Sequence, residues 1–97
     1  MLIQKSNLLE KGDKVVLRLA TGDEIACEIK SIADNELLVS RAFRLAITHQ
    51  GAGFVPFSLL IDPNADITIN RSQIVAHYAL NSDVEKDYMQ AATGIQL

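Results

Sequence analysis

Two short runs of alternating apolar and polar residues, separated by a glycine turn, constrain this chain more than any other feature. The residues that share the apolar face are Val15, Leu17 and Leu19 in the first run and Ile25, Cys27 and Ile29 in the second. A period of two residues is typical of a strand with one buried face. Thr21-Gly22-Asp23 lies between the runs, and its glycine can take the positive φ of a tight turn. The pattern predicts an antiparallel hairpin.

The β pattern continues into a third, longer run. It extends from Leu37 to Thr48 and is interrupted by Arg41 and Arg44, which predicts a bulge or bend near Ala42-Phe43. Gly-Ala-Gly at 51–53 then predicts a loop.

An apolar stretch follows that loop. Its Pro56 restricts it to a sheet edge or the start of a strand, because proline cannot donate to a ladder. A short strand over 66–70, a tight corner at 71–73 and a last strand over 74–79 complete the β pattern.

The period changes to that of a helix after residue 80. Ser82-Asp83-Val84-Glu85 has the spacing of a capping box. One apolar helical stripe is formed by Val84, Tyr88, Ala91 and Ile95, and Gly94 predicts the stop. The expected fold is therefore mainly β: a five-stranded, strongly bent open barrel over 14–80 with a C-terminal helix over 82–94, in one domain of residues 1–97.

Charge and cysteine content limit the function classes. Nine Lys and Arg against twelve Asp and Glu give a net charge of −3, so the chain lacks the general basic field of a protein that grips phosphates. The positive charges of several copies of one arginine around a symmetry axis would still add up to a local basic field. The lone Cys27 excludes an internal disulfide framework and favours a reducing, cytoplasmic location. No signal peptide or membrane span is expected, because apolar runs of the needed length are absent from the sequence.

Two segments resemble the motifs of a known family. VVLRLATGDEIACEIKSIADNELLV, residues 15–39, is similar to the first Sm motif, and ITINRSQIVAHYAL, residues 67–80, is similar to the second. The chain thus resembles the Sm-like proteins, bacterial Hfq and the archaeal and eukaryotic Lsm proteins, whose fold is a small barrel of SH3 type. The long segment between the motifs is similar to that of short Sm-like proteins of cyanobacterial viruses, that is, of phage.

The resemblance implies a homo-oligomeric ring. In the family, the fourth strand of one subunit pairs with the fifth strand of the next, and such pairing satisfies the unpaired edges of a small barrel. About five to seven copies would close the ring. The residues expected at the interface are Ile67, Ile69, Ile74, Val75, Ala76 and Tyr78.

The resemblance also implies a site for single-stranded RNA. Its candidate residues are Asp34 and Asn35 in the loop after the second strand and Asn70, Arg71 and Ser72 at the corner. The family stacks a base on an aromatic or other planar side chain in that loop, whereas this loop reads Ala-Asp-Asn-Glu. Stacking contributes ~1–3 kcal/mol per base, so the site is incomplete. The alternative is a structural turn in which Asn and Ser satisfy backbone amides.

The remaining polar residues have simpler interpretations. Arg41 and Arg44 could form a basic strip, or pair with Glu28 or Glu36 across the sheet. The two histidines and the single cysteine have no metal-ligand spacing, so neither a metal nor a cofactor is expected. No catalytic motif occurs, and we expect a binding protein, not an enzyme.

Two functions therefore compete. The first is an Sm-like ring that binds RNA. The second is a ring that serves as a structural or protein-interaction module and binds no nucleic acid. The missing aromatic residue, the acidic charge and the long segment 48–66 favour the second.

Overall fold

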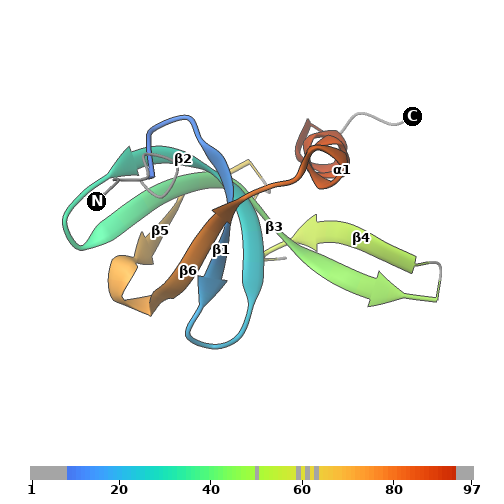
Figure 1. Cartoon of the computed structure of the whole chain (residues 1–97), viewed down its shortest axis with the longest axis horizontal. Coiled ribbons are helices and arrows are strands. Elements are labelled where there is room, and N and C mark those ends of the chain that lie inside the picture. Colours follow the sequence, from blue (N-terminus) through green and yellow to red (C-terminus); the bar gives the residue numbers. More distant parts are fainter. Residues whose placement is uncertain (1–8, 50, 59, 61, 63, 94–97) are drawn as a thin grey trace, which may run out of the picture.

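The computed structural model describes residues 9–49, 51–58, 60, 62 and 64–93. The strands are β1 (Lys14–Leu19), β2 (Glu24–Ile32), β3 (Glu36–Thr48), β4 (Gly51–Pro56), β5 (Ile67–Asn70) and β6 (Ile74–Ala79). A 3-10 turn, Arg71–Gln73, joins β5 to β6, and the helix α1 spans Ser82–Thr93. Figure 1 shows a bent sheet with the helix at one side and the β3–β4 hairpin projecting away. The mainly β fold with a C-terminal helix is confirmed.

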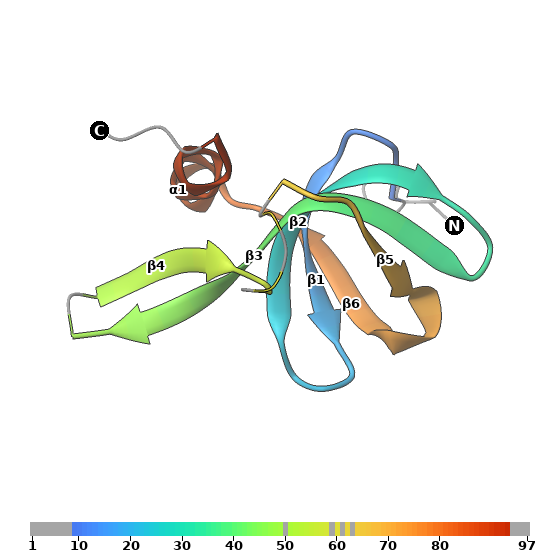
Figure 2. The same cartoon turned by 180° about the vertical axis from the view of Figure 1, so that it is seen from behind.

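All strand pairs are antiparallel, and the sheet runs in the order β4-β3-β2-β1-β6, with β5 on the first half of β3. β3 therefore belongs to two parts of the sheet, pairing with β5 through residues 36–39 and with β4 through residues 43–48. In the part of the chain that the structure describes, β5 and β6 do not pair with each other, so the sheet is not closed. Figure 2 shows β5 and β6 diverging from the turn that joins them.

The predicted count of five strands is wrong, because the glycine segment is a strand and not a loop. Residues 51–53 begin β4, and the ladder between β3 and β4 runs from Thr48 opposite Gly51 to Phe43 opposite Pro56. The backbone supplies the hydrogen bonds of a ladder, so small residues can join it when a neighbouring strand is already in place. The prediction that Pro56 belongs to an edge strand is confirmed, although Pro56 ends β4 and does not begin a strand.

The bend of β3 centres on Arg41. The register shifts between Ala26 and Glu28 of β2, because Ala26 pairs with Phe43 and Glu28 pairs with Ser40. Arg41 and Ala42 of β3 therefore lie opposite the single β2 residue between them. Arg41 has φ of 53°, the only positive φ of a non-glycine residue in the described chain. An extra residue in one strand bends that strand and increases its twist. The predicted bulge is confirmed.

Two apolar clusters lie on opposite faces of the sheet. The alternation in the first two strands fills the larger cluster, which consists of Val15, Leu17, Ile25, Cys27, Ile29, Leu37, Val39, Ala42 and Ile69. The second cluster lies under the helix and contains Ala26, Phe43, Tyr88 and Ala92. The prediction that Cys27 is a small core residue is confirmed, since its side chain is fully buried.

Asn81, and not Ser82, caps the helix. The Asn81 side-chain oxygen accepts a hydrogen bond of 2.9 Å from the Val84 N–H, and its carbonyl accepts one of 2.8 Å from the Glu85 N–H. Ser82 is thus the first helical residue. The expected capping box at 82–85 is therefore wrong: the cap lies one residue earlier, and the third residue after it is Val84, whose side chain cannot bond back to the cap. The predicted stop at Gly94 and the stripe residue Ile95 lie outside the described residues.

Tyr88 fixes the helix to the sheet. Its ring packs edge-on against Phe43 and Phe54, with centroid distances of 6.2 and 5.8 Å. Edge-to-face pairs of this kind contribute about 0.5–1.5 kcal/mol in addition to the free energy gained from the area that they bury.

No helix in the described chain is long and apolar enough to span a membrane.

Candidate nucleic-acid interface

The loop after β2 and the turn after β5 meet at one end of the sheet. The pairing of Glu36 with Asn70 brings them together. The Arg71 N–H donates to the Asn35 carbonyl oxygen at 2.9 Å, and the Arg71 guanidinium donates to the Ala33 carbonyl oxygen at 2.9 Å. The loop is itself closed by a bond of 2.9 Å from the Ala33 N–H to the Glu36 carbonyl. Loop and turn thus form one connected surface.

The side-chain oxygen of Asn70 and the hydroxyl of Ser72 form hydrogen bonds within the turn. The Asn70 Oδ1 accepts hydrogen bonds from the Ser72 N–H at 3.1 Å and from the Ser72 hydroxyl at 3.0 Å. This is the local bonding that the alternative interpretation of the turn predicts for Asn70. The Ser72 hydroxyl bonds to a side chain instead of a backbone amide, which fixes the rotamer of Asn70.

Asp34, Asn35 and Arg71 keep unused hydrogen-bonding groups at the surface. All three side chains are exposed. Among the described residues, Arg71 uses only one guanidinium donor, and the single ion pair joins Arg18 to Glu24, so no described carboxylate neutralises Arg71. An unpaired cation beside an unpaired carboxylate and an amide can bind a polar, planar group such as a base edge, with a phosphate on the cation.

Arg41 and Arg44 lie apart from this surface and differ from each other in environment. Arg41 is half-buried at the bulge, whereas Arg44 is exposed on a regular part of β3 opposite Ile25. Neither forms an ion pair with Glu28 or Glu36 within the described residues.

The residues expected at a subunit interface fall into two groups. Ile69 is buried in the larger cluster, and Ile67 and Ile74 pack against it, so these side chains serve the protein's own core. In contrast, Val75 and Tyr78 are 61% and 44% exposed on β6. Ala76 is half-buried and faces Arg18 of β1. Within the described chain, β5 and β6 each have a strand on one side only.

Burial raises the pKa values of two ionisable groups, the Cys27 thiol and the Tyr88 hydroxyl. It raises the pKa of the Cys27 thiol to about 12. It is also the main reason that the pKa of Tyr88 is raised, with smaller contributions from Cys27 and Glu28 that the Arg41 guanidinium opposes. No group of three or more His, Cys, Asp and Glu side chains among the described residues could hold a metal ion.

The sequence did not reveal an apolar groove on the face of the sheet opposite the larger apolar cluster. It lies between α1 and the β3–β4 hairpin, and its lining includes Leu45, Phe54, Tyr78 and Asp87. The alternation of Leu45 and Ile47 in the second half of β3 could have indicated an apolar face there.

Comparison of the chain with models of known protein families and with curated proteins finds no match.

Proposed function

We propose that this chain is a subunit of a homo-oligomeric, Sm-like ring that binds single-stranded RNA on the surface formed by residues 33–36 and 70–73. The observation that supports it most is the pair of hydrogen bonds from Arg71 to the carbonyls of Ala33 and Asn35. They hold the polar loop and the cationic turn in contact, as recognition of one nucleotide by both requires.

The groups present have the chemistry for a nucleotide but not for tight binding. Asp34 and Asn35 offer acceptors and a donor for a base edge, and Arg71 offers a cation for a phosphate. The loop has no aromatic side chain, so each base loses the ~1–3 kcal/mol that stacking would give. Affinity per site is therefore low and depends strongly on salt.

A ring would compensate for that weakness. The free edges of β5 and β6 are joined by a short turn, and pairing of one edge with the other edge of the next copy satisfies the backbone groups of both. Rotational closure leaves no free edge. Several copies of Arg71 would then surround one axis and bind one strand together, which raises avidity without new contacts.

RNA binding is tested by fluorescence anisotropy with labelled U-rich and A-rich oligonucleotides at low salt. We expect binding that weakens with salt, and a loss of about tenfold or more for Arg71→Ala, since a charged hydrogen bond contributes about 1.5–3 kcal/mol. Arg18→Ala is the matched control, because Arg18 is also exposed but lies on β1, and it should change affinity little. An absence of affinity for both oligonucleotides would sink the proposal.

Ring formation is tested separately by light scattering at micromolar concentration. We expect a mass of several subunits for the wild type and a smaller mass for Val75→Asp, which places a charge on the free face of β6. Leu60→Asp, at a residue that is 93% exposed and belongs to neither β5 nor β6, should leave the mass unchanged. A wild-type monomer would contradict strand-mediated closure.

A further inference from the structure

The outer face of the sheet carries a continuous apolar strip. Cross-strand pairs place Tyr78 opposite Val16, Val16 opposite Ala26, and Ala26 opposite Phe43. Opposed residues of adjacent strands lie on the same face of a sheet, so the strip crosses β6, β1, β2 and β3. It is the face away from the larger apolar cluster, and α1 covers only the part around Ala26 and Phe43.

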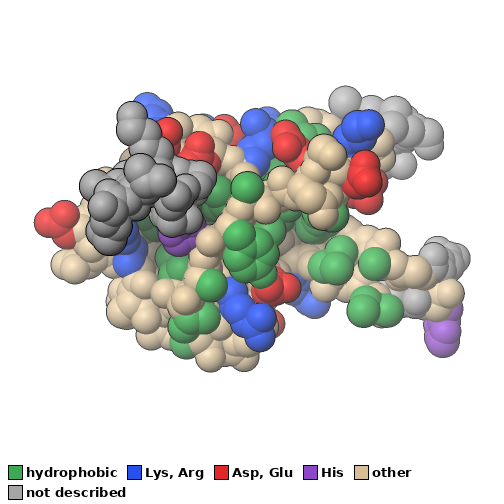
Figure 3. All heavy atoms as spheres, viewed as in Figure 1, with side chains coloured by type: hydrophobic (Ala, Val, Ile, Leu, Met, Phe, Trp, Pro, Cys, Tyr) green, Lys and Arg blue, Asp and Glu red, His purple; other side chains and the backbone are tan. Residues whose placement is uncertain are grey.

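Part of this strip lines a groove with two walls. Its floor is Val16 and Ala26; the helix wall has Val84, Asp87, Gln90 and Ala91; and the hairpin wall has Leu45, Ala52, Gly53 and Phe54. The volume is about 650 Å³. Sites that bind small ligands or peptide side chains are typically mostly apolar and about 300–1,000 Å³ in size. Figure 3 shows apolar side chains on this face, on the projecting hairpin and at the centre of the sheet.

The hairpin wall extends the apolar surface beyond the body of the protein. β2 pairs with β3 only up to Arg44, so Leu45 and Ile47 lie in a two-stranded ribbon. They are 54% and 84% exposed and share a face with Phe54. A two-stranded ribbon is marginally stable alone. Exposed apolar side chains that adjoin a groove mark interaction surfaces.

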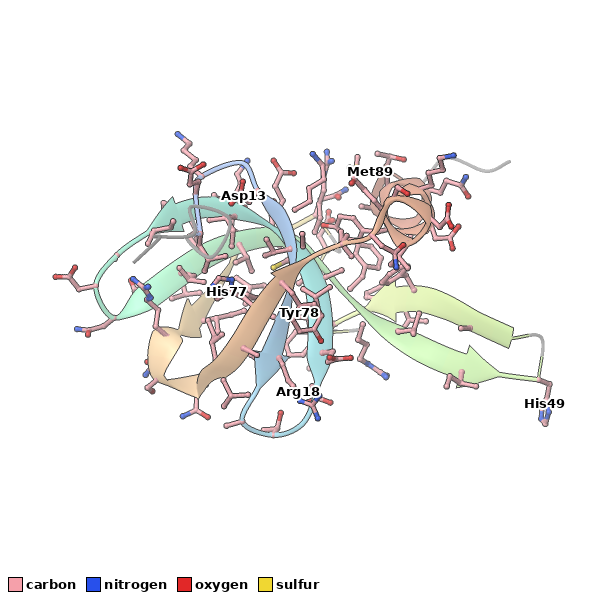
Figure 4. The ribbon with its side chains drawn as sticks, viewed as in Figure 1. Asp13, Arg18, His49, His77, Tyr78 and Met89 are labelled. Carbon is pink, nitrogen blue, oxygen red and sulfur yellow. The ribbon has the colours of Figure 1, made fainter. Side chains whose placement is uncertain are left out.

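The charges in the groove are all negative. Among the described residues, its lining contains Glu24 and Asp87 and no Lys or Arg. Glu24 accepts a hydrogen bond from the Tyr78 hydroxyl and lies 3.8 Å from the Arg18 guanidinium, so it is partly compensated. Figure 4 shows Tyr78 on β6 and Arg18 near the end of β1. Asp87 has no ion-pair or hydrogen-bond partner for its carboxylate among the described residues.

We propose that the groove between α1 and the β3–β4 hairpin binds an apolar peptide segment of another protein that carries a Lys or Arg beside its apolar residues. The apolar residues cover Leu45 and Phe54, and the cation pairs with Asp87. A second copy of the chain fits this site less well, because it has the same net charge of −3 and its exposed apolar strand, β6, contains neither Lys nor Arg. The site lies on the face opposite the larger cluster, and its lining includes none of residues 33–36 and 70–73.

The test is selection from a displayed library of short random peptides on the immobilised full-length protein. The expected result is enrichment of apolar sequences that contain Lys or Arg. Selected peptides should bind Leu45→Asp at least about tenfold more weakly, as expected for an apolar contact near the centre of an interface. Leu60→Asp is the matched control and should bind them as the wild type does.

The role of the carboxylate is measured with the same peptides. Asp87→Lys should lower affinity by about three- to tenfold, since it replaces an exposed ion pair by repulsion. Glu85→Lys makes the same change outside the groove, on the same helix, and should have no such effect. Selection without cationic bias, or no selection above the Leu45→Asp background, would overturn the proposal. So would self-association that Leu45→Asp abolishes, because the occupant would then be a second copy.

Discussion

The hydroxyl of Tyr88 donates a hydrogen bond of 2.7 Å to the carbonyl oxygen of Arg41, the residue with positive φ at the bulge of β3. A bulge leaves backbone groups without partners in the ladder, and here a helical residue 47 positions away supplies one. The helix, the bend of β3 and the hairpin beyond that bend therefore depend on one side chain.

Replacing Tyr88 by Phe should destabilise the protein by about 1–2 kcal/mol. The ring keeps its contacts with Phe43 and Phe54, but the Arg41 carbonyl loses its partner in a partly buried place. Urea unfolding measures the change. Tyr78→Phe is the control: it removes an exposed hydrogen bond to Glu24 and should change stability by less than about 0.5 kcal/mol. Equal losses of stability in the two variants would show that the partly buried hydrogen bond contributes no more than the exposed one.

Arg41→Gly should be less destabilising than Arg44→Gly by about 1 kcal/mol. The left-handed backbone of Arg41 strains any residue with a Cβ, and glycine relieves that strain. Arg44 lies in regular strand, where glycine only adds conformational entropy to the unfolded chain. Paired urea melts of the two variants measure the difference, and the reverse order would contradict the assignment of the bulge.

Asn81→Ala should destabilise the protein by about 1 kcal/mol, because the Val84 N–H at the start of the helix loses its acceptor. Ser82→Ala should have an effect within about 0.5 kcal/mol, since Ser82 already lies inside the helix. Thermal unfolding followed by circular dichroism compares the two. A larger loss for Ser82→Ala would restore the capping box that the sequence predicts.

The buried thiol of Cys27 should make stability fall with alkaline pH. Its pKa is raised from 9.0 to about 12, so the folded protein keeps a proton that the unfolded chain loses. The contribution is fully present below about pH 9 and is lost as the pH rises toward 12. The slope approaches about −1.4 kcal/mol per pH unit.

Urea unfolding of the wild type and of Cys27→Ala, with reductant, at pH 7 to about 10 checks this expectation. The variant loses buried volume at every pH, which shifts its whole curve, but the difference between the two curves should narrow above about pH 9. A constant difference would mean that the thiol is accessible to water in the folded protein.

The elements that the sequence predicts well are those whose signal is local. The alternation of Val15, Leu17 and Ile25 needs only one buried face to become a hairpin, and the corner at residues 71–73 needs only the side chains of Asn70 and Ser72. Asp34 and Arg71 were predicted as one site only through a resemblance. The hydrogen bonds of Arg71 to Ala33 and Asn35 come from the pairing of β3 with β5, and the sequence between these distant residues carries no local trace of it.

The sequence alone determined the pattern of apolar and polar residues. That pattern indicates which side chains face the core, where the chain reverses direction, and that a helix follows the last strand. The tertiary structure decided the rest, because it depends on pairing between distant segments. Gly51 becomes a strand residue because β3 extends far enough to pair with it, and Arg41 takes positive φ because β2 is one residue shorter across the bulge. The groove beside Leu45 exists because Tyr88 holds α1 over only part of the outer face.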